Sequence, residues 1–129
     1  MDGAELGRLR SAQQQDADLI TLVAWMHGNQ PSLDVVRTSS PDLQCYYQLL
    51  RYLYLDDAGI LRISQTSPEE LPGGRLVVPI QSKIRESILE KGHIHKSHGY
   101  LEDRTAFWKI TECYFWPRLE IELTQRIAN

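Results

Sequence analysis

Three of the four histidines in the chain lie within six positions, at residues 93, 95 and 98. A neutral imidazole binds zinc well, and a structural zinc site takes four His or Cys side chains in a tetrahedron. The spacing of His93 and His98, or alternatively of His95 and His98, is typical of the first half of a two-part zinc site. The second half should be a Cys-x-x-Cys pair, whereas the sequence holds only Cys45 and Cys113, far apart.

Other interpretations of these residues stay open. His93 and His95 could be exposed at the end of a helix, where positive charge is favoured, while His98 caps or packs. Three histidines could also hold a zinc-bound water in a small hydrolase, which predicts tight zinc binding by the histidines alone. A nucleophilic pair of Cys113 with a histidine is disfavoured, because nothing orients the base and burial raises the pKa of a thiol. We expect Cys45 and Cys113 to be core residues.

Composition and charge narrow the class of protein. A chain of 129 residues with 42% hydrophobic content is long enough for one ordinary domain or two very small ones. No window approaches the ~20 apolar residues of a membrane span, and the first residues resemble neither a secretory signal nor a transit peptide. We expect a nuclear or cytoplasmic protein that is not secreted. The net charge of −3 lacks the basic surplus typical of nucleic-acid binders, although residues 83–109 are mildly basic.

The elements that position the histidines follow from periodicity and capping. Apolar residues at helical spacing predict an amphipathic helix over residues 11–26, ended by Gly28, Asn29 and Pro31. Ser40-Pro41-Asp42 combines a capping hydroxyl, a first-turn proline and an acid near the helix dipole, and so predicts a second helix.

A small sheet should follow these helices. Two β-prone runs, 52–55 and 60–63, flank Asp56-Asp57-Ala58-Gly59, which predicts a hairpin in which the acids serve the turn rather than a metal. Residues 75–79 give a third short strand stopped by proline. So small a sheet needs a helix to cover it.

Three helices are predicted after Pro79. Ile84, Ile88 and Leu89 recur at helical spacing, with Glu86 and Glu90 paired against Lys83 and Arg85 on the solvent side. The histidines stand at the end of this helix. A further helix from about residue 101 carries Trp108, expected in the core, and Tyr114. Pro117 then begins a last helix with Leu119, Ile121, Leu123 and Ile127 on its apolar face.

This order of elements, with its motifs, resembles the zinc-binding amino-terminal (HHCC) region of integrases from gypsy-type retrotransposons and related retroviruses. The resemblance covers residues 50–129 well, and the helices before residue 50 resemble the amino-terminal extension of the larger integrases. The residues that carry it are Leu76-Val77-Val78-Pro79, Ile84 to Leu89, His93, His98, Gly99, Thr105 and Tyr114-Phe115-Trp116-Pro117, after the upstream hairpin of residues 54–62.

The resemblance implies the fold and a metal site. The fold would be α+β: a helical extension (1–50), a small antiparallel sheet of about three strands (51–79) and an incomplete three-helix HHCC zinc domain (80–129). The ligands would be His93 (alternatively His95) and His98, answered by a Cys pair beyond Asn129. Zinc binding by these 129 residues would then be weak or absent. Cys113 stands where the family has no cysteine, and the interval from His98 to Trp116 is about two residues longer than in the family.

The resemblance also implies a function without catalysis. In the family this region supports multimerisation and touches viral or element DNA ends. The positions expected to contact DNA are Lys96, Arg104, Lys109 and Arg118. No carboxylate triad for DNA cutting can be assembled from this sequence, so we expect no enzyme activity, no small-molecule substrate and no membrane, but DNA binding through the full-length protein and a homo-oligomer. The alternative is a protein-interaction module of a host protein derived from such an element.

Overall fold

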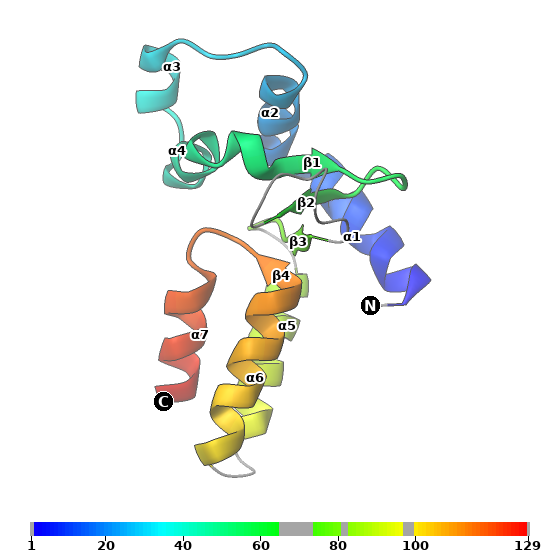
Figure 1. Cartoon of the computed structure of the whole chain (residues 1–129), viewed down its shortest axis with the longest axis vertical. Helices are drawn as coiled ribbons and strands as arrows, with labels where there is room; N and C mark the ends of the chain where they lie inside the picture. The colour runs from blue at the N-terminus through cyan, green and yellow to red at the C-terminus, as the bar shows by residue number, and fades with distance from the viewer. Residues whose placement is uncertain (1, 65–73, 81–82, 97–99, 129) are drawn as a thin grey trace.

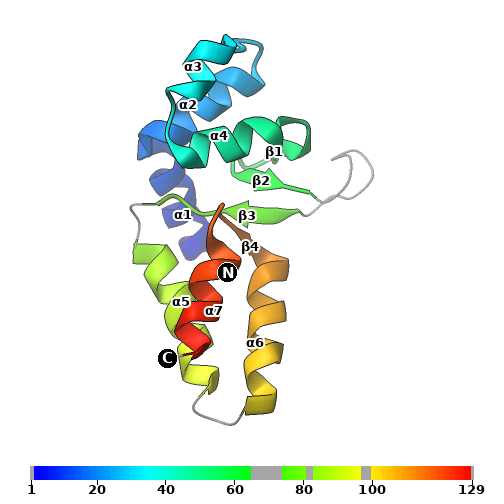
Figure 2. The ribbon, with the colours of Figure 1, turned by 90° about the vertical axis from the view of Figure 1, so that its left-hand side faces the viewer.

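The computed structural model describes residues 2–64, 74–80, 83–96 and 100–128, of which residues 92–96, 100–106 and 127–128 are described by their backbone only. The fold is α+β, as predicted, with a small mixed sheet between two groups of helices (Figure 1). Helices α2 to α4 lie at one end of the molecule and α5 to α7 at the other, while α1 runs beside the sheet (Figures 1 and 2).

The amino-terminal helices divide where the sequence predicted continuity. A single helix over residues 11–26 is wrong, because Asp16 takes an extended conformation and ends one helix while beginning the next. Its carboxylate accepts the N–H of Leu19 at 2.9 Å, which satisfies one of the free donors at the new helix start. The four helices are α1 (Gly3–Gln15), α2 (Ala17–Met26), α3 (Leu33–Arg37) and α4 (Pro41–Gln48).

The predicted start of α4 is confirmed, and α3 was not anticipated. The Ser40 hydroxyl accepts the N–H of Leu43 at 3.1 Å, with Pro41 in the first turn. The same hydroxyl donates to Asp18 on α2 at 2.8 Å, so one residue both caps α4 and fixes it to its neighbour. The short helix α3 begins at a similar cap, where the hydroxyl of Ser32 accepts the N–H of Val35.

The predicted hairpin is present, with its acids in the turn. A 3₁₀ turn, η1 (Leu50–Tyr52), leads into β1 (Leu53–Leu55), which pairs antiparallel with β2 (Leu61–Ile63). Asp56 accepts the N–H groups of Ala58 and Ile60, and its other oxygen pairs with Arg62 at 2.7 Å. Burial raises the pKa of Asp56, but the hydrogen bonds from Arg62 and the two backbone groups outweigh it and lower the pKa below 3.8.

The sheet has a fourth strand that the sequence did not predict. β3 (Arg75–Val77) pairs antiparallel with β2, as expected, and β4 (Tyr114–Phe115) pairs parallel with β3, in the order β1-β2-β3-β4. The expected antiparallel sheet of about three strands is therefore corrected to a mixed four-stranded one. Tyr114, expected in a helix, belongs to this strand.

Three helices occupy the carboxyl-terminal part. They are α5 (Lys83–Lys96), α6 (Tyr100–Cys113) and α7 (Leu119–Ala128), and each packs against the other two. Leu119 and Leu123 of α7 are buried, as predicted, while Ile121 is exposed. Arg126 of α7 pairs with both Glu86 and Glu90 of α5. Glu86 and Glu90 therefore pair with Arg126, and not with Lys83 and Arg85 as the sequence suggested.

Two apolar clusters meet at the sheet. One joins Leu9 of α1 to buried residues of α5, α6 and α7, with Trp116 among them. The other joins α2 and α4 to the hairpin, and includes Leu22, Tyr46 and Val77. Because strand β3 contributes to both clusters, the two groups of helices share one sheet as their common support.

Gln13 of α1 is the polar group that ties a helix to the interior of the sheet. It is 6% exposed, its amide nitrogen donates to the carbonyl oxygens of Leu61 (3.0 Å) and Val77 (2.7 Å), and its amide oxygen accepts the N–H of Leu61 (2.8 Å). These contacts satisfy backbone groups that antiparallel pairing of β2 with β3 leaves unused. The sequence placed Gln13 only in a glutamine-rich run.

Replacing Gln13 by leucine should lower the free energy of unfolding by about 2–4 kcal/mol, because buried backbone groups lose their partners. Urea unfolding followed by circular dichroism measures this loss. Gln14→Leu is the matched control, since Gln14 is exposed on the same helix. Equal stability of the two variants would show that the Gln13 amide does not hold the sheet.

Candidate metal and nucleic-acid site

The histidine-bearing segment lies at the end of α5 farthest from the sheet. His93 and His95 fall in the last turn of this helix, as predicted, with only their backbone described, and His98 lies outside the described residues. α5 runs away from the sheet, α6 returns to it and α7 runs away again (Figures 1 and 2). The last turns of α5 and α7 therefore lie at the same end of the helical group.

This placement decides which groups could share an ion with the histidines. α7 runs from the sheet in the same direction as α5, whose last turn contains His93 and His95. A structural zinc ion needs four ligands, and a His pair supplies two of them. Within the part of the chain whose side chains are described, no group of three His, Cys, Asp or Glu residues could hold a metal.

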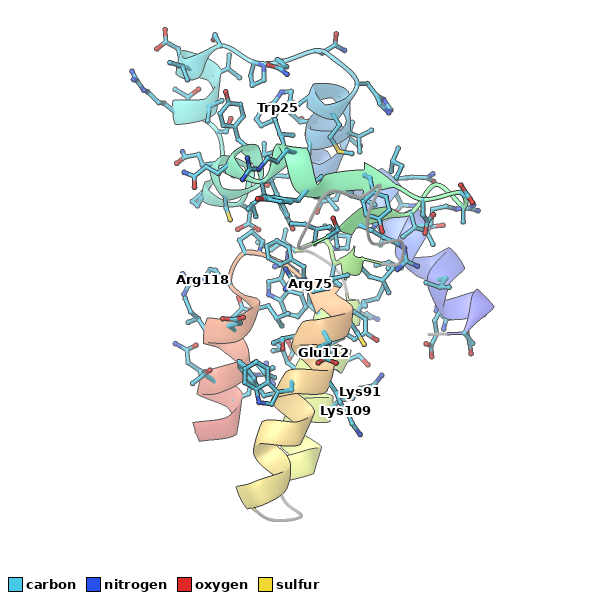
Figure 3. The ribbon with its side chains drawn as sticks, in the orientation of Figure 1. Trp25, Arg75, Lys91, Lys109, Glu112 and Arg118 are labelled. Carbon is cyan, nitrogen blue, oxygen red and sulfur yellow. The ribbon has the colours of Figure 1, made fainter. Side chains whose placement is uncertain are left out.

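The predicted DNA-contacting residues do not form one surface. Lys109 on α6 and Arg118 before α7 are both exposed, but they project on opposite sides of the helical group (Figure 3). Lys96 and Arg104 lie on α5 and α6, with only their backbone described. Lys91 of α5, exposed and not singled out from the sequence, projects on the same side as Lys109 (Figure 3). Its only signal was its place in the mildly basic segment.

Arg85 is the strongest correction to the charge pattern, because it is buried rather than solvent-facing. It is 8% exposed, and its Nε and Nη2 donate to the carbonyl oxygen of Val78 at 3.0 and 2.8 Å. The guanidinium lies 4.8 Å from the ring centre of Trp116 and 3.8 Å from a carboxylate oxygen of Asp42. Arg85 thus joins α5 to α4, to the end of β3 and to the segment before α7.

The titratable groups around Arg85 lie in surroundings of low polarity, which shift their pKa values. Burial raises the pKa of Asp42, an effect that Arg85 opposes and that Asp18, Glu122 and Asp16 reinforce. Burial likewise raises the pKa of Arg85's neighbour Tyr46, whose hydroxyl has no hydrogen-bond partner among the described residues. One cation facing several acids suits a structural contact, and we assign it no catalysis.

Two residues expected in the core are exposed. Cys113 is exposed at the end of α6, and Cys45 is half-buried. Burial raises the pKa of Cys45, with Asp42 adding to the shift, so that thiol is a poor nucleophile. Trp108 is 58% exposed and touches Phe107 edge-on, whereas Trp116 is 1% exposed. The expectation that Trp108 is a core residue is therefore wrong.

Neither the comparisons with known proteins nor the search for membrane-spanning helices identifies a function for the chain. In the described part of the chain, every helix is too short or too polar to cross a membrane. No family model, curated protein or solved structure matches the chain at a significant level.

Proposed function

We propose that the chain is the non-catalytic amino-terminal region of an integrase-like protein. In this role it supports multimerisation and contacts element or viral DNA ends during DNA integration. Zinc would be held by His93 (alternatively His95), by His98 and by two cysteines that follow residue 129 in a longer chain. The ion would fasten the last turn of α5 to the chain beyond α7, and structural zinc supplies much of the folding free energy of small domains.

One observation carries the proposal: α5 and α7 end on the same side of the helical group, with the histidine segment at the end of α5. Arg126 in the last turn of α7 pairs with Glu86 and Glu90, which precede the histidines on α5, so a chain that continued beyond α7 could reach the histidine segment with a Cys pair. The exposed Lys91 of α5 and Lys109 of α6 supply positive charge in the same helical group. Contacts to DNA phosphates need positively charged side chains, and these contacts do not require recognition of a DNA sequence.

A designed extension tests the zinc site. We expect the chain of 129 residues to bind zinc weakly, and the same chain with an appended Cys-x-x-Cys segment to bind one zinc ion tightly. Cobalt substitution reports the ligands, because thiolate and imidazole ligands give distinct absorption bands. His93→Ala and His98→Ala in the extended chain should each weaken binding by at least about tenfold.

Two controls make that test decisive. His27→Ala should leave zinc binding unchanged, because His27 is exposed at the end of α2, in the other helical group. If His95→Ala abolishes binding and His93→Ala does not, the alternative ligand is correct. Tight zinc in the chain without added cysteines would favour the three-histidine hydrolase instead, and unchanged binding after all three histidine substitutions would contradict the proposed site.

The second candidate is a protein-interaction module of a host protein derived from such an element. The net charge of −3 favours it, since a DNA-binding region usually has a basic surplus. DNA binding by the zinc-loaded protein separates the two functions. An affinity that falls steeply as salt rises supports DNA contact, and the absence of measurable binding at low salt supports the module.

A further inference from the structure

Two hollows, the larger one of mixed lining and the smaller one mainly apolar, lie side by side where α2 passes the edge strand β1, and Leu55 lines both of them. The larger, of about 520 Å³, lies at the end of α2 and has Trp25, Met26, Leu50 and Leu53 among its walls. The smaller, of about 230 Å³, lies beside the earlier turns of α2 and has Leu19, Ile20, Val23 and Leu61 among its walls. Both hollows therefore follow the axis of one helix.

Buried side chains form the base of this surface, and solvent-exposed side chains form its edge. Leu19, Trp25 and Leu53 are buried and hold their positions in the core beneath. Ile20 is 54% exposed and Leu55 37% exposed, so large apolar side chains face solvent above that floor. Exposed apolar residues that adjoin hollows of this size mark interaction surfaces more often than isolated ones do.

One residue with a full charge is among those that line the two hollows. Arg51 is the only Lys, Arg, Asp or Glu residue that lines either hollow, and His27 is the only histidine. The exposed Arg51 guanidinium lies 4.7 Å from the ring centre of Tyr52 and donates to its hydroxyl at 2.6 Å. Among the described residues no carboxylate pairs with Arg51. A guanidinium without a counter-ion favours an acidic partner.

We propose that this surface, formed by α2 and β1, binds an acidic amphipathic helix of a partner protein. From Leu19 in the smaller hollow to Met26 in the larger, α2 advances by about 10 Å at ~1.5 Å per residue. Anchors two turns apart on a second helix have the same separation, so one apolar side chain would enter each hollow. A carboxylate beyond the second anchor would meet Arg51. The inference does not depend on the proposed function, because no histidine of residues 93–98 and no DNA-contacting residue takes part.

The test uses the whole chain and defined peptides. An 18-residue helical peptide with leucine anchors on one face and glutamate on the other is titrated into isotope-labelled protein and followed by NMR. A second peptide carries lysine in place of glutamate, and a third carries serine in place of the leucine anchors. We expect the acidic peptide to shift the resonances of α2 and β1, and the other two to bind at least about fivefold more weakly.

Variants assign the binding to this surface. Leu55→Asp and Ile20→Asp should each weaken binding of the acidic peptide by at least about fivefold, and Arg51→Glu should reverse the preference toward the basic peptide. Leu33→Asp is the matched control, because Leu33 is 62% exposed but lies on α3 and lines neither hollow. If Leu55→Asp fails to fold, Ile20→Asp and Arg51→Glu carry the test. The proposal is overturned by no binding, by shifts centred elsewhere, or by an equal loss in Leu33→Asp.

Discussion

Replacing Trp116 by alanine is expected to lower the free energy of unfolding by about 3–5 kcal/mol, among the largest effects of a single substitution in this chain. The indole is 1% exposed and packs in the cluster that joins Leu9 of α1 to α5, α6 and α7. Its Nε1 donates to Glu122 at 3.1 Å, and Arg85 stacks on its ring. Alanine would leave a cavity, a free carboxylate and an uncovered guanidinium at one place.

Urea unfolding followed by far-ultraviolet circular dichroism measures this loss, with Trp108→Ala as the matched control. Because Trp108 is 58% exposed, its removal should change the free energy of unfolding by less than about 1 kcal/mol. The comparison holds the residue type constant and varies only burial. Similar losses for the two variants would mean that Trp108, and not Trp116 alone, packs in the core.

Replacing Arg85 by methionine should lower the free energy of unfolding by about 2–4 kcal/mol at neutral pH. Methionine keeps much of the packing volume but removes both donors to the Val78 carbonyl and leaves the Asp42 carboxylate, 15% exposed, without its cation. Arg118→Met is the control, since Arg118 is exposed and its loss should stay within about 0.5 kcal/mol.

The pH dependence of the Arg85 variant identifies the cause. The pKa of Asp42 is raised above 3.8 by burial, so the charged carboxylate weakens the fold, and this penalty is relieved as pH falls through the raised pKa. Without Arg85, which lowers that pKa, the penalty is larger and its relief begins at higher pH. The stability gap between Arg85→Met and the unchanged chain should therefore narrow on acidification. With Asp42→Asn in both backgrounds the gap should no longer depend on pH; persistence of the narrowing would point to Asp16, Asp18 or Glu122 instead.

Local signals in the sequence predicted local structure. The Ser40-Pro41 helix start, the hairpin around Asp56 and the presence of the last three helices depend on residues within a few positions of each other, and the structure contains all of them, although α7 begins at Leu119 and not at Pro117. The break at Asp16 was missed because an acid within the first turn of a helix and an acid that separates two helices look alike in sequence. β4 was missed because its partner β3 stands far upstream, on the other side of two helices.

Burial of particular side chains was harder to predict than the elements that carry them. Arg85 stands among charged neighbours and so looked solvent-exposed, yet Val78, Trp116 and Asp42 converge on it from three other segments. The position of His93 and His95 at the end of α5 was predicted, since it needs only the helix boundary. The separation of Lys109 from Arg118 was not predicted, because it depends on how α6 and α7 pack against each other.

The parallel pairing of β4 with β3 fastens α5 and α6 at their base. Its ladder joins Leu76 to Tyr114 and Val77 to Phe115, and the N–H of Val78 donates to the Phe115 carbonyl at 3.0 Å. If the chain were cut between α5 and α6, β3 would still attach one piece to the sheet and β4 would attach the other. The base of the helical pair is therefore held by backbone hydrogen bonds, whichever side chains stand at its far end.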